Sequence, residues 1–375
     1  MSKLNNKTNL LDHSKAKVKL LEEYIKRYLN IISNDKYTEI IHIHDLFCGQ
    51  GLYENGEHGS PLVALKQIRQ VYFEIINKRT PKQPKINCHF NDIEFSKIEI
   101  LKNSINCSSL HYPNIGEVNL TTNDYKVEVE KLKEKFANFK HEKAFVFIDP
   151  YGYKELVAND IKDLLGSHKK SEILVWLPIQ FMYRFAGEGT PPTLKNFMSD
   201  LRVEKEAQKS KNVWEFILIL KNGFQNFLGN NFFVDHFSLK KEENAVFCLF
   251  FFTSHIRGFE KMLESKWEID TEEGRGWKYT GNSPGLFFDQ KTNELEMLLK
   301  EYIREGRRYN YDVYEFTLRK GYLPKHATEI LSNLQKNKIL DVFLANGEKA
   351  RKNSFYIKYY KPTDIENKKV YFTLK

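Results

Sequence analysis

The order in which apolar and amphipathic segments follow one another constrains the fold of this chain most strongly. Seven short segments rich in β-branched and aromatic residues are typical of buried strands, and helical lengths separate the first six. These segments are residues 39–47, 86–92, 116–124, 143–150, 171–179, 231–239 and 245–254. Strands that alternate with helices pair in parallel, with helices on both faces of the sheet. The sequence therefore predicts a doubly wound α/β fold.

Only the segment KKEEN, residues 240–244, separates the last two predicted strands. A connection this short joins antiparallel neighbours. A mostly parallel, seven-stranded, Rossmann-like sheet with this ending is the class I methyltransferase variant of the dinucleotide-binding architecture. We expect it to occupy residues 1–285.

Apolar periodicity predicts the helices. Residues 13–32 carry an apolar stripe with spacings of three and four, which indicates an N-terminal helix. The members of the stripe are Val18, Leu21, Ile25, Tyr28, Leu29 and Ile32. Later helices are expected at residues 61–77, from residue 96, at 127–139, at 156–165 and, as one longer helical region, at 193–228.

Residues 286–375 no longer show the alternation of strand-like and helix-like segments, and they are predicted to form a second domain. Helices are expected at residues 292–304 and 311–320, with Gly321 ending the second, and a third helix begins at Pro324. Residues 338–360 are predicted to close the domain as two strands around a basic turn. Three helices followed by a hairpin indicate a winged helix-turn-helix.

Charge concentrates at the C-terminal end. The formal net charge is +9, and residues 291–375 contribute 18 Lys and Arg against 11 Asp and Glu, a net of +7. A basic terminal module favours DNA or RNA as a partner, although an ordinary solvated surface explains it as well. With 41% apolar residues but no apolar run of membrane length, we expect a globular, cytoplasmic protein without a membrane partner.

The four cysteines, Cys48, Cys88, Cys107 and Cys248, are too scattered for a zinc site or a disulfide framework. We expect buried free thiols and no metal.

The segment HDLFCGQGLYENGEHGSPL, residues 44–62, places Asp45 at a strand end and Gly49 and Gly51 in the following turn. Glycines permit positive φ and close approach of the backbone to a ligand. An acid suits the cationic amino group of S-adenosylmethionine (SAM) better than a diphosphate, and a third glycine and a G-K-[ST] motif are absent. The rest of the segment is interpreted as a lid over this cofactor. An ordinary strand-to-helix turn remains the alternative.

Acids end three further predicted strands. Asp92, with Glu94 in reserve, suits ribose hydroxyls, and Asn123 with Asp124 suits the adenine amino group. A helix cap or a plain turn explains either pair equally well. In DPYG, Asp149 is positioned to orient a target amine and Tyr151 to stack on a base, so these two are the candidate catalytic residues.

The predicted wing and the helix before it carry the candidate nucleic-acid contacts. They are Lys325, His326, Lys336, Lys349, Arg351 and Lys352. Cations at these positions would contact phosphates. Solvated turns and protein contacts are equally common uses of such residues.

Three motifs resemble the three-Cys-motif partner (TcmP) family, whose members are class I SAM-dependent methyltransferase-like. They are H-x-x-x-K at residues 13–17, the glycine loop from Asp45 to Leu62, and FIDPYG at residues 147–152. Cys48 and Gln50 depart from the usual loop. The resemblance implies a cofactor site that includes Phe47, and a radical-SAM-like partner protein with three cysteines.

Two functions compete. One is a methyltransferase that uses SAM on nucleic acid or a nucleic-acid component. The other is a non-catalytic nucleic-acid-binding or adaptor module that acts through the winged helix. A nuclease is weaker, because Asp92, Asp149 and Glu155 lack a metal-ligand spacing.

Overall fold

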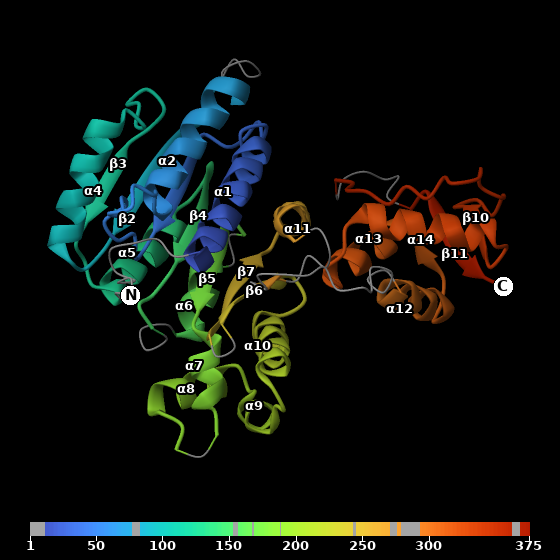
Figure 1. The fold of residues 1–375 in the computed structure, drawn as a ribbon. Helices are drawn as coiled ribbons and strands as arrows, with labels where there is room; N and C mark the ends of the chain where they lie inside the picture. Colours follow the sequence, from blue (N-terminus) through green and yellow to red (C-terminus); the bar gives the residue numbers. More distant parts are fainter. Residues whose placement is uncertain are drawn as a thin grey trace. The chain divides into compact units, whose positions relative to one another are not determined.

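Within the described residues, eight strands form one sheet in the order β3-β2-β1-β4-β5-β7-β6-β8 (Figure 1). The computed structural model describes residues 12–76, 83–152, 157–166, 169–187, 189–242, 245–270, 276–278, 293–361 and 368–375. The strands are β1 (Ile40–Asp45), β2 (Lys85–Asn91), β3 (Val118–Thr121), β4 (Glu142–Ile148), β5 (Ser171–Leu177), β6 (Phe233–Glu242), β7 (Ala245–Thr253) and β8 (Gly276–Lys278).

The strand order confirms the predicted fold class. Strands β1 to β5 are mutually parallel, and β7 inserts between β5 and β6, antiparallel to both. All seven predicted strands are present. The short β8 pairs in parallel with β6 and extends the sheet by one strand. This strand was not predicted, because its sequence contains no apolar run.

Helices cover both faces of the sheet (Figure 1). They are α1 (Asp12–Ile32), α2 (Ser60–Val71), the π-helical turn η1 (Tyr72–Ile76), α4 (Phe95–Ser108), α5 (Tyr125–Ala137), α6 (Ala158–Leu165), α7 (Ile179–Arg184), α8 (Pro192–Asp200), α9 (Glu204–Lys209), α10 (Val213–Leu228) and α11 (Ile256–Ile269). Among the described helices, none is both long and apolar enough to cross a membrane.

Alternation along β4 shows how the two faces are filled. Phe145 packs on Tyr24 of α1, with ring centroids 5.4 Å apart, whereas Val146 and Ile148 join a buried cluster with residues of α5, α6, α7 and α10. Helix α1 is anchored further by Glu172 of β5. This buried carboxylate accepts hydrogen bonds from Tyr24 and, at 2.8 Å, from Thr253. The N-terminal helix is therefore an integral part of the sheet unit.

The region predicted as one helix over residues 193–228 is three helices, α8, α9 and α10. Arg202 has a left-handed φ of 57°, which ends the first helical run. Asn212 then caps α10 by accepting from the backbone amides of Trp214 and Glu215. No glycine or proline occurs between residues 201 and 212, so the usual sequence signals of a helix end are absent at these breaks.

Two compact units divide the chain, residues 1–261 with 276–279 and residues 262–275 with 280–375. The second unit contains the helices α12 (Asn293–Arg304), α13 (Asn310–Arg319) and α14 (Pro324–Lys336) and a sheet of order β10-β11-β9. Its strands are β9 (Arg308–Tyr309), β10 (Leu340–Leu344) and β11 (Val370–Leu374). The predicted apolar face of α14, made of Ala327, Ile330, Leu331 and Leu334, is buried.

The closing hairpin differs from the prediction. Strand β10 pairs with β11, not with the residues at 354–360, and it makes only an isolated bridge from Phe343 to Lys349. Positive φ values of 62° at Asn353 and 53° at Tyr356 prevent an extended strand there. Phe355 and Ile357 are nevertheless buried, which explains why the segment has a strand-like pattern.

Candidate active site

Asp45 ends β1 as a buried acid with an unsatisfied oxygen. Its Oδ1 accepts from the backbone amide of Phe47 at 3.3 Å, while Oδ2 is buried and has no hydrogen-bond partner in the described structure. Burial, reinforced by the nearby Asp149 carboxylate, raises the pKa of Asp45 to about 7, although the neighbouring Ser60 hydroxyl opposes the rise. A carboxylate in this state is suited to receive a cationic or hydrogen-bond-donating group.

The glycine loop that follows Asp45 is shaped by two left-handed residues. Gly49 has a φ of 63° and Gly51 a φ of 73°. A Cβ on Gly51 would lie 2.4 Å from Leu101 Cδ1 of α4, whereas a Cβ on Gly49 would meet no atom within 4 Å. Gly51 is therefore needed for packing, and Gly49 leaves open space beside the strand ends.

The second half of the loop is an ordered turn. Leu52 and His58 form an antiparallel bridge, and Tyr53 accepts from Gly56 at 2.9 Å through its backbone carbonyl. Gly59 donates its amide to the Gly51 carbonyl at 2.6 Å, and helix α2 begins at Ser60 as predicted. The predicted role of this turn as a lid stays a prediction.

The candidate catalytic acid Asp149 is paired with a lysine of the N-terminal helix. Lys17 donates to Asp149 Oδ2, and its ammonium lies 5.0 Å from the ring centroid of Trp176 on β5. The two side chains are 14% and 20% exposed, so the pair is largely shielded from water. Burial opposes the charge of Lys17, but the Asp149 carboxylate outweighs it and the pKa of Lys17 is raised.

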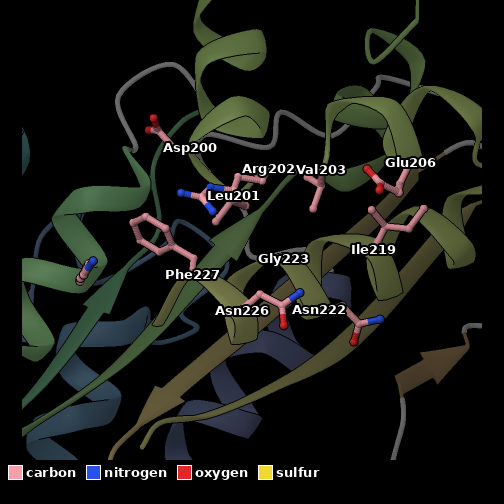
Figure 2. A pocket seen from close by; sticks show the side chains of 11 residues that line it. Asp200, Leu201, Arg202, Val203, Glu206, Ile219, Asn222, Gly223, Asn226 and Phe227 are labelled. Carbon is pink, nitrogen blue, oxygen red and sulfur yellow. The ribbon is translucent and has the colours of Figure 1, made fainter. Parts of the chain in front are cut away.

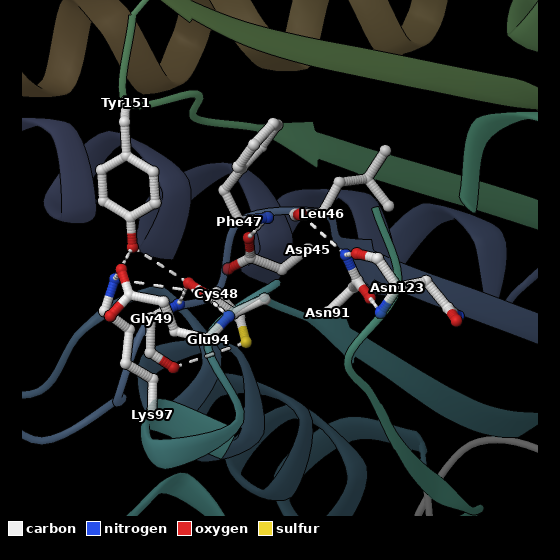
Figure 3. Close-up of polar contacts among 11 residues, drawn as sticks. Asp45, Leu46, Phe47, Cys48, Gly49, Asn91, Glu94, Lys97, Asn123 and Tyr151 are labelled. Atoms are coloured by element: carbon white, nitrogen blue, oxygen red, sulfur yellow. Dashed lines mark hydrogen bonds and ion pairs between the residues drawn. The ribbon is translucent and has the colours of Figure 1, made fainter. Parts of the chain in front are cut away.

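Asp92, one residue beyond β2, is the centre of a second polar cluster. Figure 3 shows Gly49, Glu94, Lys97 and Tyr151 gathered at this cluster. Its Oδ2 accepts from the Gly49 amide and from the Tyr151 hydroxyl, both at 3.0 Å, and its Oδ1 accepts from the Glu94 amide at 3.0 Å. The glycine loop, the end of β2 and the DPYG turn thus meet at one carboxylate. Glu94, the reserve candidate, is the N-cap residue of α4.

Tyr151 crosses from the end of β4 to this cluster. The residue is 64% exposed, as expected, but Lys97 of α4 donates to its hydroxyl, and the Lys97 ammonium lies 4.2 Å from the ring centroid. Desolvation of the hydroxyl and the negative Asp92 carboxylate raise the pKa of Tyr151. Phe47 lies 6.3 Å away, edge to face, and stacks on Tyr125 at 5.2 Å.

The end of β3 is held by an amide that sequence reasoning missed. Asn91 donates to the carbonyls of Leu46 and Asn123 at 3.3 and 3.0 Å, and its Oδ1 accepts from Thr121 and from the Asn123 amide. Asp124 accepts from the Lys126 amide as the N-cap of α5. Asp124 therefore has a capping role, and its proposed contact with adenine is not needed to explain it.

Lys17, Lys97 and Asn91 are additions to the predicted set. Lys17 was part of the H-x-x-x-K motif but carried no assigned role, and nothing local marks Lys97 on its helix. Glu155 lies outside the described residues. Of the cysteines, Cys48, Cys88 and Cys248 are buried as predicted, but Cys107 is exposed on the outer face of α4.

A separate pocket of about 550 Å³ lies away from these strand ends (Figure 2). Phe227, Asn222 and Asn226 of α10 line one side of it, and the turn around Arg202 lines the other. None of the candidate site residues borders this pocket.

Five of the six candidate nucleic-acid contacts are exposed in the second unit. They are Lys325, Lys336, Lys349, Arg351 and Lys352. Lys349 pairs with Asp341 at 3.2 Å. His326 differs from expectation, because its Nδ1 accepts from the Leu323 amide at 3.1 Å and its ring packs on Trp267 at 4.3 Å. It caps α14 instead of facing a phosphate.

Residues 276–347 match a protein-family model described as a GMT-like wHTH domain, which agrees with the winged helix-turn-helix seen in the second unit. No curated protein is similar enough to the chain by sequence to count as a relative.

Several solved structures are similar at low sequence identity. Protein LPL1258 from Legionella pneumophila matches with 11% identity over 68% of this chain and 90% of its own, with a TM-score of 0.39. An O-methyltransferase from Bacillus cereus, solved with SAH, matches with 12% identity over 65% and 84%, with a TM-score of 0.33. The methyltransferase domain of bacterial CtHen1 matches with 11% identity over 62% and 98%, with a TM-score of 0.31. The strand order and register of the chain itself define its fold.

Proposed function

We propose that this chain is a SAM-dependent methyltransferase whose cofactor lies at the carboxyl edge of β1, β2 and β4. The observation that carries the proposal is Asp45 Oδ2, which is buried and has no hydrogen-bond partner among the described residues, together with the open space at Gly49 in the loop that follows. Leaving a buried polar atom without a partner costs about 1–3 kcal/mol, so such an atom at a strand end favours a ligand that satisfies it.

The residues present fit SAM. Asp45 would accept a hydrogen bond from the ammonium group of SAM, and Asp92 would accept from its ribose hydroxyls. The Gly49–Gly51 turn would let the cofactor approach the protein backbone closely. Bound SAM would supply an electrophilic methyl group. In open α/β folds, ligands bind at this edge of the sheet, where all of these residues lie.

Asp149 would position the group that accepts the methyl. Lys17 engages Oδ2, and in the described structure no hydrogen bond engages Oδ1, which leaves that oxygen to accept from an amine N–H. Tyr151 presents an exposed ring next to it for stacking on a base. Holding the acceptor in line with the methyl group accounts for most of the rate gain that such a site supplies.

We further propose nucleic acid, or a component of it, as the substrate. The winged helix-turn-helix and its exposed Lys and Arg residues support this choice, and the resemblance to the TcmP family adds a radical-SAM-like partner protein. The test is transfer of a labelled methyl group from SAM to DNA, RNA or the partner protein. We expect label in one of the nucleic acids and a loss of at least about tenfold with Asp149→Asn.

Label in no substrate, with SAM bound, would favour the second candidate, a non-catalytic nucleic-acid-binding adaptor. One observation supports that candidate. Both acids of the site already have protein partners, Asp149 with Lys17 and Asp92 with Tyr151 and Gly49.

The adaptor function predicts nucleic-acid binding that weakens as salt rises. In the full chain, combined Ala substitutions at Lys349, Arg351 and Lys352 should reduce both the affinity and its salt dependence. A charge-matched control would change three exposed lysines of the sheet unit, Lys66, Lys102 and Lys131. Equal effects of the two variants would show that binding responds only to net charge and would remove the wing from the proposal.

A further inference from the structure

Three histidines gather in the sheet, on the face opposite to Asp45. His42 and His44 lie two residues apart on β1 and so point to the same side, and the register of β1 with β2 sets His44 beside His89. The rings of His44 and His89 stack with centroids 4.4 Å apart. One ring nitrogen from each of the three histidines lies within 4.8 Å of the others.

A carboxylate fixes the orientation of the first histidine. His42 Nε2 lies 2.6 Å from Glu142 Oε2. Because a carboxylate only accepts, Nε2 carries the proton and Nδ1 keeps its lone pair, which faces His89 Nε2 at 3.1 Å. A carboxylate that orients an imidazole in this way is the usual support of a metal-binding histidine.

A cation already lies beside the imidazoles of His42 and His89. Lys135 Nζ of α5 lies 3.4 Å from His42 Nδ1 and 3.3 Å from His89 Nε2. An ammonium only donates, so His42 Nδ1 accepts from it. Depending on its tautomer, His89 Nε2 either accepts from the same ammonium or donates to His42 Nδ1. A cation thus already contacts both imidazoles.

The third histidine has unmet hydrogen-bonding capacity. Both ring nitrogens of His44 are buried without a partner in the described structure, and the residue is 1% exposed. Burial lowers the pKa of all three histidines, to about 3 for His42 and His89, so the rings are neutral at neutral pH. Neutral imidazole is the form that binds metal ions.

We propose that His42, His44 and His89 bind a divalent transition metal such as Zn²⁺, in competition with the Lys135 ammonium. Three imidazoles with one further position suit Zn²⁺, whose bonds of about 2.0–2.1 Å place tetrahedral ligands about 3.4 Å apart. The His42–His89 pair is already near this spacing. His44 must rotate toward the other two, and Lys135, at the half-buried edge of the cluster, must swing outward on its flexible stem.

The bound ion would join β1 to β2 directly behind the strand ends. Sequence reasoning predicted no metal, because it considered the scattered cysteines and did not group these three histidines, the last of which follows His44 by 45 residues. The parallel register alone brings them together.

The proposal is tested by titrating Co²⁺ into chelator-treated full-length protein that carries no polyhistidine tag. Visible absorption of cobalt reports ligand number, and Zn²⁺ should displace the cobalt. We expect one ion per chain. His89→Asn should abolish the visible band, whereas His111→Asn, at a histidine outside the cluster, should leave it unchanged.

Lys135→Met gives a readout that misfolding cannot mimic. Removing the competing ammonium should tighten the dissociation constant by about tenfold or more, because a unit charge near 4 Å is repelled by the ion. Failure of both the wild type and Lys135→Met to bind one equivalent of Co²⁺ would overturn the proposal. Unchanged binding in His89→Asn, with an intact far-ultraviolet circular dichroism spectrum, would also overturn it.

Discussion

Lys17 and Asp149, 132 residues apart in sequence, form an ion pair that joins the N-terminal helix to the DPYG turn. The pair places α1 at the edge of the sheet where Asp45 and the glycine loop lie. The first helix therefore contributes to the candidate site as well as to the core.

Replacing Lys17 tests this contribution. Lys17→Met leaves the largely buried Asp149 carboxylate without its cation, so the free energy of unfolding should fall by about 1–3 kcal/mol in urea denaturation. Lys17→Arg keeps the charge and should recover most of the loss. If Lys17→Met were as stable as the wild type, the pair would have no structural role.

Asp45 should make stability depend on pH. Its pKa in the folded state, about 7, lies above the ordinary value of 3.8, so the folded state holds the proton more tightly. The stability that this proton gives is complete below about pH 4 and is lost as pH rises through 7, by an amount on the order of 2–4 kcal/mol.

Asp45→Asn should remove that loss. Glu172, with a pKa raised by burial to about 6, should leave a smaller decline between about pH 4.5 and 6 in the variant. Urea denaturation of the wild type and Asp45→Asn across pH 4–8 measures the pH range over which each protein loses stability. Parallel stability curves for the wild type and Asp45→Asn would contradict the assignment.

The same titration should govern ligand affinity. Under the proposed function the ammonium of SAM would pair with ionised Asp45, so affinity should rise with pH up to about 7 and lose this dependence in Asp45→Asn. Calorimetric titration of SAM at pH 5.5, 6.5 and 7.5 measures whether the affinity changes with pH in this way. An affinity that does not change over this range in the wild type would show that Asp45 does not meet a cation.

Two glycine substitutions separate packing from ligand access. Gly51→Ala combines a left-handed φ with a clash against Leu101 and should destabilise the fold by more than about 2 kcal/mol. Gly49→Ala meets open space, so only the backbone strain of about 1 kcal/mol applies. Thermal denaturation should rank the two variants in this order, and Gly49→Ala should lose SAM affinity while remaining folded.

The strand-end acids were predictable because the carboxyl ends of parallel strands meet at one edge of a sheet. Asp45, Asp92 and Asp149 follow apolar runs, and the structure brings the first and third to Lys17 and the second to the glycine loop. Lys17 and Lys97 were not assigned, since a lysine on a helix carries no local sign of its partner. Only the tertiary fold sets those contacts.

Local backbone conformation explains the other differences. The left-handed Arg202 interrupts a helical pattern, and Asn353 and Tyr356 interrupt a strand-like one, without a glycine or proline to announce the break. Strand β11 then takes the place beside β10 that residues 354–360 were expected to fill.

Calorimetric titration of SAM into the wild type and Asp45→Asn tests the central claim most directly. Asp163→Asn, which removes an exposed acid of α6, is the matched control. We predict saturable binding of one SAM per chain, weakened about tenfold to a hundredfold by Asp45→Asn because a charge-assisted hydrogen bond is lost, and unchanged in the control. No binding by the wild type at millimolar SAM would contradict the account.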